Sequence, residues 1–393
     1  MWVLLGAVAC QLVPFPSGLR QLVSPYADRA IAALALTPVE AVDWDSLSLD
    51  PFATLWASAV VAGCFAVFWI ARSLIERGGL RQASRWVCAV GLAAGFLAVL
   101  QAATPGRRIY WYFEPQDPGG RPFGPFVNQN HFATWAIMAL PLAFGYIAAR
   151  GDGRESRHAI LRNTRTKLLH AIDPRAAWLA AALTIMLLAL LLSLSRSGLI
   201  ALTASAFLTL LLVRDRIGSG RGKVIASVAL AVILAVGWAD MTALGGKLAN
   251  ARGGVGGRLT IWRETLPVVR DFWLTGTGAG TYLTAMRVYQ QSDRTVYFNQ
   301  AHNHYLQIAA EGGLLLIVPA ALALAAFVRL GARRLREDLS ARVWIRAGAA
   351  CGLFAVALQS LWETGLTLPA NAALAAFLCA VVVHRGHHSH HQH

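Results

Sequence analysis

Charged side chains are scarce in this sequence. Only 14% of its 393 residues are charged, whereas a soluble domain carries roughly 25%. Acidic residues are the rarer sign, with 20 Asp and Glu against 35 Lys and Arg. Hydrophobic residues make up 56% of the chain, and its mean hydropathy is +0.51. This composition excludes an ordinary soluble domain and predicts a membrane protein.

The apolar segments lack the polar–apolar alternation of a membrane β-strand. Several are instead about 18–20 residues long, the length that a helix needs to cross the hydrocarbon layer. We therefore predict an all-α fold, a polytopic transmembrane helical bundle that forms a single domain over residues 1–393. The predicted spans, ten in all, lie at about 1–14, 52–71, 84–103, 132–149, 176–194, 197–213, 224–240, 305–328, 345–361 and 370–384.

Other common signals are missing as well. The five cysteines all lie within apolar runs, which excludes a disulfide framework and argues against thiolate metal ligands. The apolar segment 1–13 has no basic region before it, so we do not expect it to be a cleavable signal peptide. We interpret it as a short first span and expect the natural chain to begin further upstream. The histidine-rich tail after Val383 is interpreted as a solvated segment.

The basic residues are concentrated in short loops between the predicted spans. Because short cytoplasmic loops collect Lys and Arg, these loops set the topology, and no nucleic acid is needed to explain the net charge of +15. The cytoplasmic loops are 72–85, 150–175, 214–223 and 329–346. The opposite, extracytoplasmic side then receives 15–51, 104–131, 195–196, 241–304 and 362–369.

The long extracytoplasmic loop 241–304 breaks the charge rule, because its basic residues outnumber its acidic ones. Loops of this length cross the membrane largely regardless of charge. Its positive balance is therefore free to serve an anionic ligand. A second feature on this side is the interruption of the apolar stretch 176–213 by Ser193–Gly198, which predicts a helical hairpin with Arg196 at its tip.

Four clusters of polar residues are predicted to face the extracytoplasmic side. They are Gly124–His131 with Asn128, Asn130 and His131; Arg196; Gly257–Arg263 with Arg258 and Arg263, followed by Thr275–Gly280; and Ala301–Tyr305 with His302, Asn303 and His304, followed by Glu311. Each has a plain structural alternative. An arginine at a span end is often a snorkelling anchor, basic residues suit an interfacial helix, and Asn or His before a span often caps it.

Taken together, the clusters suggest chemistry. Arginine is the residue of choice for bidentate binding of phosphate, and histidine is suited to proton transfer near neutral pH. Two arginines and a histidine can bind a diphosphate leaving group and deprotonate a hydroxyl without a metal. Glu311, within or near a span, is a functional candidate by default. The Gly276–Gly280 spacing does not fit a nucleotide fingerprint, and His302 with His304 makes a poor zinc site.

These motifs resemble the O-antigen ligase family, within the superfamily shared with Wzy-type polysaccharide polymerases. The resemblance covers roughly residues 105–330. It rests on Pro125–Phe132, Ser195–Gly198, the Gly257-Arg258-x-x-x-Trp262 segment, Leu274–Gly278, and His302-Asn303 followed by Glu311-Gly312-Gly313. His304 departs from the pattern, because an acidic or small residue is more usual at that position.

The resemblance implies a GT-C-type membrane glycosyltransferase that needs no metal or cofactor. Such an enzyme transfers a glycan, with inversion, from undecaprenyl diphosphate to an acceptor hydroxyl in the periplasm. The acceptor in a ligase is lipid A–core. The family's functional arginines correspond to Arg196 and Arg258, and its histidine to His302. The other candidates are expected to bind substrate: Arg263, Asn128, Asn130, His131, Asn303, His304 and Glu311.

Three functional alternatives remain open at this point. A polymerase of exopolysaccharide or O-antigen repeats would use the same site with a growing glycan as acceptor, and a protein oligosaccharyltransferase would use a protein acceptor. A transporter of lipid-linked sugars belongs to a different class. A transporter is expected to carry ionisable groups near the bilayer midplane and inverted repeats, and neither is evident here.

Overall fold

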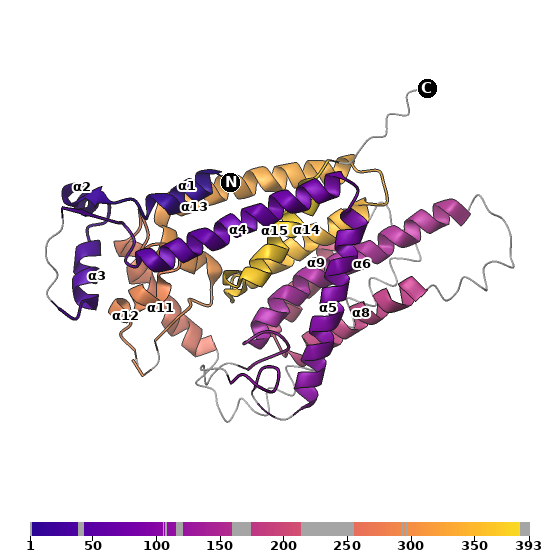
Figure 1. The fold of residues 1–393 in the computed structure, drawn as a ribbon, viewed down its shortest axis with the longest axis horizontal. Coiled ribbons are helices and arrows are strands. Elements are labelled where there is room, and N and C mark those ends of the chain that lie inside the picture. Colours follow the sequence, from indigo (N-terminus) through magenta and orange to yellow (C-terminus); the bar gives the residue numbers. More distant parts are fainter. Residues whose placement is uncertain are drawn as a thin grey trace, which may run out of the picture. The chain divides into compact units, whose positions relative to one another are not determined.

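The computed structural model describes residues 2–37, 43–104, 106, 108–114, 121–158, 174–213, 255–292, 294–295 and 297–385. Within them the fold is helical, as predicted (Figure 1). The long helices are α4 (Pro51–Glu76), α5 (Leu80–Ala103), α6 (Gln129–His158), α8 (Pro174–Leu192), α9 (Arg196–Val213), α11 (Val255–Asp271), α13 (His304–Glu337), α14 (Val343–Gln359) and α15 (Pro369–Val383). Shorter helices are α1 (Trp2–Cys10), α2 (Ser17–Val23), α3 (Ala27–Leu34), α12 (Tyr282–Tyr289) and the 3-10 turn η2 (Gly365–Thr367).

The described helices are those of a multi-pass membrane protein. Four of them, namely α4, α5, α6 and α13, are long and apolar enough to cross a bilayer by length and composition. The helices α8, α14 and α15 are shorter but also apolar. The predicted span 224–240 and residues 386–393 of the histidine-rich tail lie outside the described residues. His384, which was interpreted as part of that solvated tail, is instead buried at 1% exposure, and its Nδ1 lies 2.8 Å from the Val381 carbonyl oxygen. The prediction of a single domain of ten spans therefore stays a prediction.

Some helix boundaries differ from the predicted ones. The segment predicted as a first span forms only the nine-residue helix α1. By contrast, α13 continues to Glu337 through a segment predicted to be a loop. Glu337 pairs with Arg333 and Arg334 at N–O distances of 2.6 and 3.2 Å. Oppositely charged pairs spaced three and four residues apart stabilise a helix. The charged residues after Val328 therefore did not end α13.

The described chain divides into two compact units. Unit 1 comprises residues 1–66, 246–329 and 360–369, and unit 2 comprises 67–245, 330–359 and 370–393. Unit 2 is centred on the packing of α6 against α14. A Cβ at Gly145 would lie 2.2 Å from the Trp344 carbonyl oxygen, and one at Gly348 would lie 2.2 Å from that of Pro141. Small residues at such crossings let helix backbones approach closely in membranes.

Unit 1 has its own small core, formed by α3, α11, α12 and the start of α13. The buried side chains are Ala27, Ala30, Leu49, Val268, Phe272, Tyr282, Ala285, Met286, Ala301 and Ala310. Burial raises the pKa of Tyr282, whose hydroxyl lies 2.6 Å from Thr265 Oγ1. A short antiparallel pair of β1 (Phe15–Pro16) and β2 (Trp44–Asp45) completes this end of the unit.

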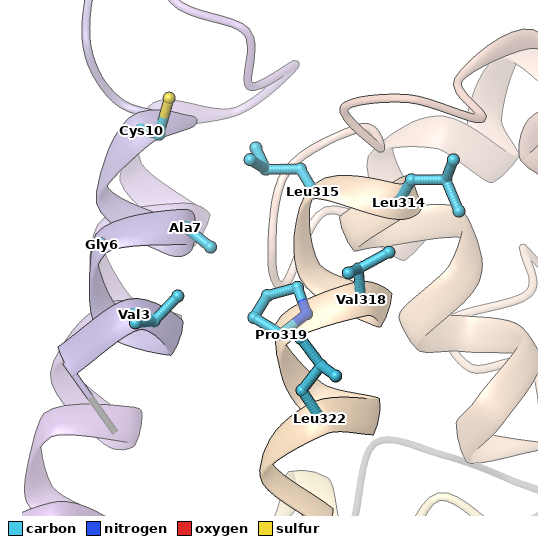
Figure 2. Close-up of a pocket in the computed structure, with 9 residues that line it drawn as sticks. All are labelled: Val3, Gly6, Ala7, Cys10, Leu314, Leu315, Val318, Pro319 and Leu322. Carbon is cyan, nitrogen blue, oxygen red and sulfur yellow. The ribbon is translucent and has the colours of Figure 1, made fainter.

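An apolar pocket lies between α1 and α13 of unit 1 (Figure 2). Figure 2 shows Val3 and Ala7 of α1 facing Leu315 and Pro319 of α13. Val3 and Leu322 at its rim are 71% and 67% exposed. An exposed apolar surface of this kind suits contact with lipid tails, because α13 is a candidate span.

Candidate functional site

His302 stands in a segment that is held from three directions. The Trp262 indole N–H of α11 donates to the Ala301 carbonyl at 2.9 Å. The Ala301 N–H donates to Gln307 Oε1 of α13 at 3.2 Å, and the His304 N–H donates to the Ser360 carbonyl at 2.8 Å. These bonds fix the segment between α12 and α13 relative to its neighbours within unit 1.

The His302 backbone adopts a φ of 48°. Only a few per cent of non-glycine residues have a positive φ, and histidine is one of the types enriched there. Such strained positions persist only where their surroundings enforce them, and they concentrate at functional sites. The neighbouring Asn303 accepts the Leu306 N–H through Oδ1 at 3.0 Å and so caps α13. The histidine is therefore held at a helix start by local bonds.

Helix α11 supplies the arginine. Arg258 and Trp262 are four residues apart and lie on the same face of the helix, which explains the spacing of the sequence motif. Arg263 lies five residues beyond Arg258, so its position is turned by about 140°, and it is exposed. Arg258 and Arg263 are therefore not brought together.

Glu363 connects the arginine to the histidine. Its carboxylate Oε1 lies 2.6 Å from Arg258 Nη2, and its Oε2 lies 3.8 Å from His302 Nδ1. Only 4% of the Glu363 side chain is exposed, whereas Arg258 and His302 each expose 32%. His302 Nδ1 is a buried nitrogen with no hydrogen-bond partner among the described residues. The two half-buried side chains thus share one buried carboxylate.

Glu363 was not among the residues predicted from the sequence. It follows the predicted ninth span and falls in the short loop 362–369, which was placed on the same side as the other clusters. The available signal was its type, since acidic residues are few and this one directly follows an apolar helix. Nearby, Thr364 Oγ1 donates to Gln300 Oε1 at 2.5 Å, which ties this loop to the His302 segment.

Glu311 is engaged by protein donors. Its carboxylate accepts the Gly280 and Tyr282 N–H groups at 3.0 and 3.2 Å and the Gln307 Nε2 donor at 3.1 Å. It therefore caps the start of α12 from within α13. Its predicted role in substrate binding stays a prediction, while these bonds give it a structural role.

The two glycine motifs that flank the site meet each other. Gly313 interrupts α13 with a φ of 51°. The Leu314 and Leu315 N–H groups then donate to the carbonyls of Trp273 and Leu274 at 2.8 and 2.9 Å. In return, the carbonyls of Ala310 and Glu311 each accept an N–H at 3.0 Å, from Thr277 and Gly278 respectively. The 273–278 turn thus replaces helical bonds that the kink breaks.

Gln11 joins this turn to the kink of α13. Its Nε2 donates to the carbonyls of Thr275 and Glu311, both at 2.8 Å, and its Oε1 accepts the Ala279 N–H at 2.9 Å. Only 1% of Gln11 is exposed. No sequence pattern pointed to this residue, because it lies in a segment interpreted as part of a membrane span.

The predicted hairpin with Arg196 is present in unit 2. Helix α8 ends at Leu192, α9 begins at Arg196, and Leu194 between them has a φ of 53°. Ser193 Oγ donates to the Leu190 carbonyl at 2.6 Å and closes the turn. Arg196 thus lies at a helix N-terminus, where the helix dipole and the unpaired N–H groups favour an anion.

The Asn128 cluster also belongs to unit 2. Asn128 Oδ1 accepts the Asn130 N–H at 2.8 Å, which agrees with the capping alternative for α6. His131 is buried, and its carbonyl accepts the Asn371 Nδ2 donor of α15 at 3.1 Å. These contacts give the cluster a structural role, and its predicted role in substrate binding is untested.

Unit 1 therefore brings together Arg258 and His302. Asn303 and His304 follow His302 in the chain. His304 is half-buried, and its Nδ1 has no hydrogen-bond partner in the described part of the chain. Arg196 and the Asn128 cluster lie in unit 2. Among the described residues there is no group of three or more His, Cys, Asp or Glu side chains arranged to hold a metal ion.

The helices and the apolar spans define a multi-pass helical membrane protein. Residues 181–321 match a family model described as O-antigen ligase, which confirms the resemblance that the motifs indicated. The match encloses Arg196, Arg258 and His302, while Asn128 and Glu363 lie outside it. No curated protein matches the chain. The match supports glycosyltransferase activity of the O-antigen ligase or polymerase type.

Proposed function

We propose that this protein is a membrane glycosyltransferase of the O-antigen ligase type. It moves a glycan from undecaprenyl diphosphate to an acceptor hydroxyl at the periplasmic face of the bacterial inner membrane, with lipid A–core as acceptor. One observation carries this proposal. The matched family segment contains both predicted arginines and the predicted histidine, and within unit 1 Arg258 and His302 are held beside one carboxylate.

The arginines are proposed to bind the diphosphate. A guanidinium has five N–H donors, and the ion pair of Arg258 with Glu363 is made through Nη2. This contact leaves other N–H donors of the guanidinium for an anion, and 32% of the side chain is exposed. Arg196 begins α9, where the helix terminus adds to its attraction for an anion. Two fixed positive charges would stabilise the negative charge that develops on the leaving diphosphate.

His302 is proposed to be the general base. The acceptor hydroxyl oxygen attacks the anomeric carbon and the sugar–phosphate bond breaks, so its electron pair leaves with the diphosphate. The hydroxyl proton moves to the imidazole. Attack from the face opposite the leaving group inverts the anomeric configuration. Since the arginines neutralise the diphosphate in this scheme, no metal is assigned to it.

The test is transfer by the purified protein in lipid vesicles. Wild-type protein is expected to move a glycan from undecaprenyl diphosphate to lipid A–core, and EDTA is expected not to inhibit it. Extension of the lipid-linked glycan instead, with no product on lipid A–core, would support the polymerase alternative. Inhibition by EDTA that Mg²⁺ reverses would replace the arginine-only scheme with a metal-bridged diphosphate. Movement of the donor across the bilayer without transfer would support a transporter.

A further inference from the structure

Glu363 is the one acidic side chain shown to contact both Arg258 and His302 among the described residues. A buried carboxylate is costly unless it is paired. Here the pairing is short on one side, at 2.6 Å to Arg258, and longer on the other, at 3.8 Å to His302. Only 4% of the Glu363 side chain is exposed. Glu363 therefore lies behind the site and does not itself meet the substrates.

The two ring nitrogens of His302 are distinguished by their distance to Glu363. Nδ1 is the nitrogen that faces the Glu363 carboxylate and has no hydrogen-bond partner among the described residues. A neutral imidazole carries its proton on one nitrogen only, and the proton is favoured on the nitrogen nearest an acceptor. The carboxylate therefore favours the tautomer with the proton on Nδ1, which leaves the lone pair on Nε2.

We propose that Glu363 is a positioning residue of the transfer site: it holds the guanidinium of Arg258 and keeps the proton of neutral His302 on Nδ1, so that Nε2 acts as the base. This inference rests on the proposed function. During transfer, Nε2 accepts the proton of the acceptor hydroxyl as the sugar–phosphate bond breaks. The imidazolium that forms is stabilised by the Glu363 carboxylate, and its proton is then lost from Nε2 to water.

The experiment compares Glu363→Gln, Glu363→Asp and a control in the vesicle transfer assay. Gln has the same shape without the charge, so we expect kcat to fall roughly 10- to 100-fold, part of the contribution of general-base catalysis. Asp keeps the charge and should recover more of the wild-type kcat than Gln does. Glu264→Gln is the control, because this α11 acid accepts the Gln291 and Ser292 N–H groups away from Arg258.

A double variant separates positioning from general stability. Because Glu363 acts through His302, Glu363→Gln should reduce kcat little further in a His302→Ala background. Wild-type kcat in Glu363→Gln would overturn the proposal, and so would a loss that is additive with His302→Ala. If Glu363→Gln does not accumulate in the membrane, the same pairing is made with Glu363→Ala, which also removes the carboxylate. No transfer by wild-type protein would instead reject the proposed function.

Discussion

At the residue scale, His302 is distinguished from His304 by its backbone and its partner. It has the positive φ and lies 3.8 Å from Glu363, whereas the His304 N–H is bonded to the Ser360 carbonyl. We predict that His302→Ala lowers transfer by about 10²–10⁴-fold, the usual contribution of a general base, while donor binding persists. His304→Ala should lose less. The measurement is donor binding and transfer, made separately on each variant.

The outcome for these two histidines is decisive in either direction. Full transfer by His302→Ala together with an inactive His304→Ala would move the base by two residues. Loss of donor binding in His302→Ala would make this histidine a phosphate ligand.

The arginines give a second prediction at this scale. Arg196→Ala and Arg258→Ala should each abolish transfer without loss of protein from the membrane. Arg→Lys should also be poor at both positions, because a point charge does not reproduce the planar fork of a guanidinium. Arg263→Ala should be milder, since Arg263 is exposed and turned away from Arg258. Transfer rates and immunoblots of the membrane fraction check this. Near wild-type rates in both Lys variants would contradict bidentate binding.

Residue types at fixed spacing were the part of the site that the sequence could predict. The spacing in Gly257-Arg258-x-x-x-Trp262 indicates two residues on one face of a helix, and His302-Asn303 indicates the capped start of another. Glu363 was beyond such reasoning, because it is 105 residues from Arg258 in the sequence and no local pattern connects them. A contact between distant segments depends on packing, which hydropathy does not encode.

At the scale of elements, hydropathy predicted the helices better than their ends. The hairpin of α8 and α9 was predicted from serine and glycine, and it is present. The kink of α13 was not, because two adjacent glycines in an apolar run are also compatible with a straight membrane helix. What fixes the kink is the 273–278 turn, whose backbone bonds to Leu314 and Leu315 come from outside the helix.

The contact between Gly276 and α13 gives a prediction about stability. Gly276 has a φ of 69°, and a Cβ there would lie 2.2 Å from the Glu311 carbonyl oxygen. Gly276→Ala should therefore destabilise the protein by at least about 2 kcal/mol, since left-handed strain alone costs about 1–3 kcal/mol. The measurement is the thermal midpoint in detergent. Gly63→Ala is the matched control, because no atom lies within 4 Å of a Cβ there, and its midpoint should not fall.

At the scale of the whole molecule, the charge of the loops predicts the topology. Reporter fusions at Arg165 and Arg216 should report the cytoplasm, and fusions at Arg121 and Thr284 should report the periplasm. Arg165 and Arg216 lie outside the described residues, so the prediction rests on their loops' basic composition. A cytoplasmic signal from Thr284 would remove the argument that the clusters share one compartment.

The exchange of bonds at the kink of α13 also makes two amide protons into local reporters. In an uninterrupted helix the Leu314 and Leu315 N–H groups would bond to the Ala310 and Glu311 carbonyls, and their hydrogen exchange would follow unwinding of the helix. Here both are held by the 273–278 turn. Their exchange should therefore follow undocking of that turn, and Gly276→Ala should accelerate it while amides beyond Pro319 stay protected.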